Sequence, residues 1–160
     1  MSTMTPTRAR WWIGRLALAG VGGLLLLQLV PYGRDHANPR ATASPRWDAP
    51  RTRELFAQAC GDCHSDLTKW RWYSNVAPAS WLVQHDVEEG RAAFDVSRWD
   101  QAQPSLDEVL EKLRSGEMPP LKYRIVHPGA RLSDGEKAAL ADGLRRTYAR
   151  RPPAAIRGEG

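Results

Sequence analysis

The chain has 160 residues, among them 23 basic residues, 18 acidic residues and only two cysteines. Three of the basic residues and none of the acidic ones fall in the first 30 positions, so the remainder carries 20 basic and 18 acidic side chains, a net charge of +2. This near balance gives no support for nucleic-acid binding, which depends on a basic surface. The sequence also lacks a serine elbow, a plausible carboxylate pair and a phosphate-binding glycine loop, so we do not expect a hydrolytic enzyme.

The first predicted element is an apolar helix near the N-terminus. Residues 16–27 are apolar without interruption, and residues 11–30 give about 30 Å of helix, enough to span a bilayer. No small-x-small cleavage pattern closes this stretch, which favours an uncleaved anchor over a removed signal peptide. Three arginines at its start predict that residues 1–10 form a cytoplasmic tail and that everything after residue 30 lies outside. We therefore expect a single-pass protein of the bacterial inner membrane, with its main domain in the periplasm.

The exported part divides into three segments by composition. Residues 31–46 are rich in proline and predict a semi-extended linker, residues 47–150 predict one modest helical domain, and residues 151–160 predict a disordered tail. Alternating strand patterns with hairpin turns are missing, so the predicted fold class is all-α. Helices are predicted within residues 48–64, 78–90, 105–116 and 133–150.

Two of these helices have strong start signals. Ser105 with Glu108, and Ser133 with Glu136, have the spacing of a capping box at a helix N-terminus. The helix within residues 78–90 is expected to end at its terminal glycine, Gly90.

Both cysteines lie in the stretch "ACGDCHSD", where Cys60, Cys63 and His64 form a Cys-x-x-Cys-His sequence. This is the pattern used for c-type haem attachment. In that chemistry the two thiols add to the vinyl groups of the porphyrin, and the histidine that follows ligates the iron. Three other interpretations compete: a structural disulfide, a thioredoxin-like redox pair and half of a zinc site. A redox pair normally lies beside a βαβ pattern and structural zinc needs four ligands, and the sequence offers neither.

The best candidate for a second iron ligand is Met118. The other two methionines are Met1 and Met4, whereas Met118 follows the third predicted helix of the exported domain and precedes two prolines that fix the backbone. His127, on a loop nine residues later, is an alternative distal ligand.

The surroundings of the predicted haem are harder to assign. The second nitrogen of the His64 ring needs a hydrogen-bond partner, and the carbonyl group of Pro78 is a candidate. Trp72, Tyr73 and Trp81 cluster in the same region and are candidates for the walls of the haem pocket, although each is as readily an ordinary core aromatic.

The chain resembles a class I c-type cytochrome and, more closely, the membrane-anchored haem-binding domain family of bacterial monohaem proteins. The matching stretches cover about residues 47–145: "PRWDAPRTRELFAQACGDCHSD", "WRWYSNVAPASWLVQHDVEEGR", "SGEMPP" and "HPGARLSDGEKAAL". The resemblance implies one covalent haem c on Cys60 and Cys63, with His64 as the proximal ligand. Met118 matches the distal position of class I cytochromes.

Two axial protein ligands leave no open position on the iron, so the expected function is one-electron transfer in the periplasm and not enzymatic catalysis. The expected partners are the membrane and unidentified periplasmic or membrane redox proteins. Two alternatives stay open: a five-coordinate or weakly ligated haem that senses or binds a gas or peroxide, and a haem-bearing subunit with a structural or assembly role.

Overall fold

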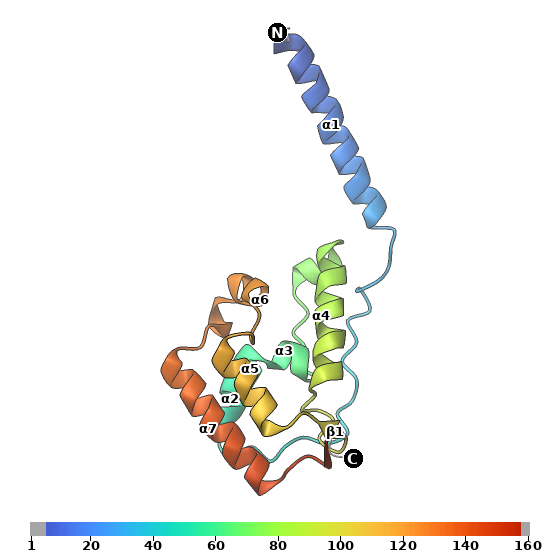
Figure 1. Ribbon diagram of the computed structural model, residues 1–160. Helices are drawn as coiled ribbons and strands as arrows, with labels where there is room; N and C mark the ends of the chain where they lie inside the picture. Colours follow the sequence, from blue (N-terminus) through green and yellow to red (C-terminus); the bar gives the residue numbers. More distant parts are fainter. Residues whose placement is uncertain (1–5, 158–160) are drawn as a thin grey trace. The chain divides into compact units, whose positions relative to one another are not determined.

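The computed structural model describes residues 6–157 (Figure 1), so the predictions for residues 1–5 and 158–160 fall outside it. The described chain is mostly helical, which confirms the all-α prediction. Its strands are a parallel pair of two residues each and one isolated bridge, Ala43 with Arg98. The elements are α1 (Pro6–Leu27), α2 (Pro50–Ala59), α3 (Gly61–His64), η1 (Trp72–Asn75), α4 (Ala79–Ala93), β1 (Ala102–Gln103), α5 (Leu106–Ser115), α6 (Leu121–Val126), η2 (Pro128–Ala130), α7 (Asp134–Arg150) and β2 (Ala155–Ile156).

The chain forms two compact units. The first unit contains the chain up to His36 together with residues 70–85, and the second contains residues 37–69 and everything from Asp86 onward. Within the first unit, α1 is the one helix of the described chain whose length and composition would let it cross a membrane. Its apolar side chains are exposed, as expected of a helix that faces lipid.

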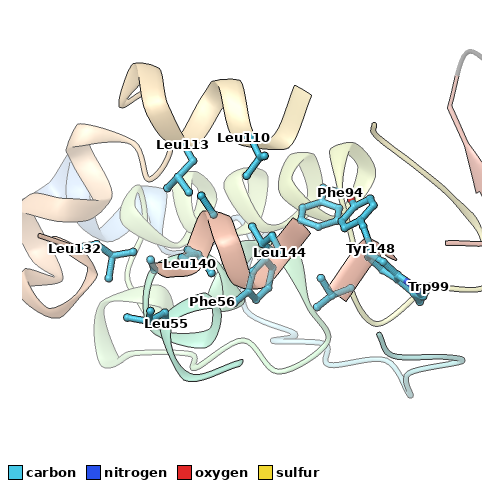
Figure 2. Packing of buried hydrophobic residues seen from close by; sticks show 13 residues of the cluster. Leu55, Phe56, Phe94, Trp99, Leu110, Leu113, Leu132, Leu140, Leu144 and Tyr148 are labelled. Carbon is cyan, nitrogen blue, oxygen red and sulfur yellow. The ribbon is translucent and has the colours of Figure 1, made fainter. Parts of the chain in front are cut away.

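The core of the second unit is built by α2, α5 and α7 (Figure 2). Leu55 on α2, Leu110 on α5 and Leu140 on α7 are the largest of its side chains that are almost wholly buried. Gly143 lets α2 approach α7 closely, because a Cβ atom there would lie 2.8 Å from the Cβ atom of Thr52. A further set of buried aromatic side chains extends the core along α7: Phe56, Phe94, Trp99 and Tyr148.

The capping signals read from the sequence are confirmed. The Ser133 hydroxyl accepts from the Glu136 N–H, and the Glu136 carboxylate accepts from the Ser133 N–H, so both halves of the capping box are present. At α5 only one half of the predicted box is present, the Ser105 hydroxyl accepting from the Glu108 N–H, and α5 ends at Gly116, whose φ of 75° lies in the left-handed region. The predicted end of α4 is wrong, because the helix passes through Gly90 and continues to Ala93.

Parts of the segments predicted to be a semi-extended linker and a disordered tail make hydrogen bonds to the second unit. In the second unit, the N–H groups of Thr42 and Ala43 donate to the Ser97 carbonyl, so residues 37–46 are held along the domain and are not a free spacer. At the other end, β2 pairs with β1, and the Ala154 N–H donates to the Trp99 carbonyl. Both segments satisfy backbone groups that would otherwise have only water as a partner.

The close approach at Gly143 generates a stability prediction. Gly143→Val places two methyl groups against Thr52, and we expect a loss of about 1–3 kcal/mol in the free energy of unfolding from overpacking. Gly135→Val in the same helix is the matched control, because a Cβ atom there has no neighbour within 4 Å. Thermal denaturation of both variants tests this, and equal melting temperatures would show that α2 and α7 are not in contact at Gly143.

Candidate haem-binding site

The second unit contains a cleft between α2, α5 and α7. Its empty volume is about 780 Å³, open solvent at its mouth included. Most of its lining is apolar, and two charged side chains, Glu108 and Lys112, also border it. The remaining lining residues are Phe56, Cys60, His64, Ala93, Phe94, Pro104, Val109, Leu113, Met118, Leu140 and Leu144.

Three residues that the sequence singled out therefore line one cleft: Cys60, His64 and Met118. The local fold explains how the first two come together. Helix α2 ends at Ala59, and the His64 N–H donates to the Cys60 carbonyl at 3.0 Å. This single helical turn places residues four apart on the same side of the chain.

The His64 ring is oriented by the backbone of α4. Its Nδ1 lies 2.9 Å from the Gly90 carbonyl oxygen and 2.9 Å from the Phe94 carbonyl oxygen. Since a carbonyl can only accept, Nδ1 must carry the proton and donate, which leaves the lone pair on Nε2 for a metal ion. Burial lowers the pKa of His64, although the hydrogen bonds to these carbonyls oppose the shift. The neutral ring is the form that binds a metal.

The predicted role of Pro78 in holding this ring is wrong. The Pro78 carbonyl instead accepts the N–H groups of Trp81 and Leu82 in the first turn of α4. Trp72, Tyr73 and Trp81 all belong to the first unit, whereas every residue that lines the cleft belongs to the second. Their role as haem walls stays a prediction.

Gly90 is the site residue that sequence reasoning missed. A Cβ atom at this position would lie 2.4 Å from the Cys63 carbonyl oxygen and 2.8 Å from the Cys63 Cβ atom. Only a glycine lets α4 approach the Cys-x-x-Cys-His turn closely enough for its carbonyl to reach the His64 ring. The available signal was a glycine inside a helical pattern, which often marks close packing, but we interpreted it as a helix end.

The two thiols do not have the properties of a redox pair. Burial raises the pKa of Cys60 to about 12 and that of Cys63 to about 11, with Asp86 and Asp62 adding to the second shift. A redox-active cysteine needs a lowered pKa, and burial shifts the pKa of both thiols in the opposite direction. Both are free in the structure. In the described part of the chain, no group of three or more His, Cys, Asp and Glu residues could hold a metal ion, which also disfavours a zinc site.

Met118 is fixed at the cleft by the loop that follows α5. The chain leaves the helix through Gly116, and the Met118 N–H donates to the Lys112 carbonyl at 3.1 Å. Pro119 is buried and Pro120 precedes α6, so the backbone on the far side is also restrained.

His127, the alternative distal ligand, packs against Tyr123. The His127 ring stacks on Tyr123 with 4.0 Å between ring centroids, and its Nδ1 lies 3.1 Å from the Tyr123 carbonyl oxygen. His127 is not among the residues that line the cleft.

This donor set fits a haem. The cleft offers an apolar surface for a flat macrocycle, an imidazole with a free Nε2 on one wall, and a thioether from a separate loop. Cys60 borders the same space. These residues do not form a carboxylate-rich site of the kind that binds a hard cation.

The fold and the cleft thus define a small helical haem protein. Residues 22–146 match the family model described as a haem-binding domain, and the chain belongs to this haem-binding domain family. No curated protein and no solved structure matches the chain. Haem binding is therefore the function that the family assigns, and the cleft around His64 is the candidate site for it.

The crossing at Gly90 generates a prediction about haem content. Gly90→Val would push α4 away from Cys63 and withdraw the carbonyls from His64, so we expect the purified protein to lose most of its haem. Ala92→Val is the matched control, because Ala92 is exposed on the same helix. Haem per chain is measured by absorbance and helix content by circular dichroism. Normal haem loading in Gly90→Val would show that the close crossing is dispensable.

Proposed function

We propose that the protein is a monohaem c-type cytochrome that carries single electrons in the periplasm while anchored to the inner membrane. The single observation that carries the proposal is that Cys60, His64 and Met118 line one apolar cleft. A haem bound there supplies a reversible one-electron couple at its iron. The residues of the chain then have to hold it, fill both axial positions and keep water away.

Covalent attachment is supported by the turn that contains both cysteines. Cys60 and Cys63 flank one helical turn, in which the Cys63 N–H donates to the Cys60 carbonyl at 3.2 Å, so the local backbone holds the two cysteines close together. On a haem bound there, each thiol would add across a vinyl group, its sulfur bonding to one carbon and its proton going to the neighbouring carbon. His64 follows directly and would ligate the iron through Nε2.

Electron transfer is supported over ligand binding by the position of Met118. As the distal ligand, the Met118 thioether would close the iron to gases and raise its reduction potential relative to a second imidazole. The loop that carries Met118 is restrained on both sides, by the bond to Lys112 and by two prolines. Apolar walls, among them Leu140 and Leu144, lower the local dielectric and also favour the less charged, reduced iron.

The periplasmic location is supported by two independent features. The sequence of α1 from Arg10 to Leu27 is apolar enough to cross a membrane, and the arginines lie at its N-terminal end. Attachment of haem to a Cys-x-x-Cys-His sequence takes place on the outer side of the bacterial cytoplasmic membrane. Both features support a periplasmic location for the second unit.

Met118→Ala tests the proposed ligation and with it the electron-carrier role. We expect the oxidised variant to lose the far-red sulfur-to-iron absorption band and the reduced variant to bind carbon monoxide, because a coordination position has opened. His127→Ala is the control and is expected to keep the band, since His127 does not line the cleft. If the wild-type protein itself binds carbon monoxide avidly, a gas-binding or sensing role replaces electron transfer.

A further inference from the structure

The end of the membrane helix is fastened to the segment that precedes α4. Gln28, the residue directly after α1, donates from Nε2 to the Ala77 carbonyl at 2.9 Å and accepts the Ala77 N–H on Oε1 at 3.0 Å. Its amide therefore pairs with both backbone groups of one residue, as a neighbouring strand would. Arg34 donates to the same Oε1 at 3.0 Å and holds the amide in place.

Two further contacts continue this attachment along the chain. Gly33 has a φ of 79°, and a Cβ atom there would lie 2.4 Å from the Ser80 carbonyl oxygen. The His36 ring stacks on Trp70 at 4.7 Å between centroids, and its Nε2 lies 2.9 Å from the Ser74 carbonyl oxygen. Residues 28–36 are thus not a solvated linker but one side of a packed structure, the other side of which is residues 70–80.

The position of α1 in the bilayer determines how far residues 28–36 and 70–80 lie from the membrane surface. If the apolar helix spans the bilayer, as the proposed function requires, Gln28 lies at the outer membrane surface, because about twenty residues of helix already cover the hydrocarbon thickness. Ala77 is within hydrogen-bond distance of Gln28, so the residues around it share that depth.

The same segment exposes large apolar side chains. Trp72 is 78% exposed, Leu82 49% and Val76 46%. Tryptophan favours the membrane–water interface, where its apolar ring and its polar N–H are both accommodated. Arg71, the neighbour of Trp72, is also exposed and is placed to meet lipid phosphate groups.

We infer that η1 and the first turn of α4, with Trp72, Val76 and Leu82, form a membrane-surface patch that inserts into the outer interface of the bilayer. The occupant is lipid, because the patch is hydrogen-bonded to the end of the only helix in the described chain that could cross a membrane. Gln28 sets the position of the patch. The chain therefore moves away from the membrane surface at residues 36 and 70, whereas the sequence predicts that it does so after residue 30.

Photo-crosslinking of the full chain in phosphatidylcholine nanodiscs tests this inference. A benzophenone amino acid replaces Trp72, and the products are separated and identified by mass. We expect a covalent lipid adduct at this position and none when the probe replaces Arg145, an exposed residue of α7 in the second unit. Adding Gln28→Met, which keeps the side-chain length but removes the amide, is expected to reduce the adduct at position 72.

A probe at Leu24 within α1 distinguishes failure of the proposed patch from failure of the proposed anchor. An adduct at Leu24 without one at position 72 overturns the patch but leaves the anchor standing, whereas no adduct at Leu24 overturns the proposed anchor and the patch with it. A cross-linked dimer at position 72 in place of a lipid adduct assigns the surface to a second copy of the chain. Equal adducts at positions 72 and 145 overturn the patch as a distinct surface.

Discussion

The haem site depends on the crossing of α4 over the turn that carries both cysteines. Gly90 brings the α4 backbone into contact with Cys63, and this contact lets two carbonyl groups hold Nδ1 of His64. The segment that follows α4 also binds the backbone of the turn, because the Val96 N–H donates to the His64 carbonyl at 3.0 Å. The orientation of the ring is therefore set by main-chain atoms, which a side-chain substitution elsewhere does not easily disturb.

Around this crossing, different elements supply different parts of the candidate haem site. Helices α2, α5 and α7 supply the apolar walls, the turn after α2 supplies the cysteines and the histidine, and the loop after α5 supplies the methionine. In the first unit, the Gln28 side chain ties the end of α1 to Ala77, in the segment before α4. Helix α4 begins in the first unit and ends in the second.

The sequence was a good guide where the determining contacts are local. Ser105 and Ser133 marked the starts of α5 and α7 because a cap bonds to a residue three positions away. It was a poor guide where the partners are distant. The strand at Ala155–Ile156 pairs with residues more than fifty positions earlier, and α6 has no capping side chain but is fastened by Tyr123, whose hydroxyl donates to Asp62 at 2.7 Å. Pro78 was the wrong partner for His64 for the same reason, since the choice among carbonyls depends on which helix crosses the turn.

The central claim is that the haem is bonded to the chain at this turn. The most direct test is to denature the purified protein, remove dissociable haem with acidified organic solvent and measure the mass of the chain by mass spectrometry. The account predicts a chain heavier than its sequence by one haem, and a return to the mass of the bare polypeptide when Cys60→Ser and Cys63→Ser are combined. A wild-type chain that gives up its haem to the solvent would contradict the account.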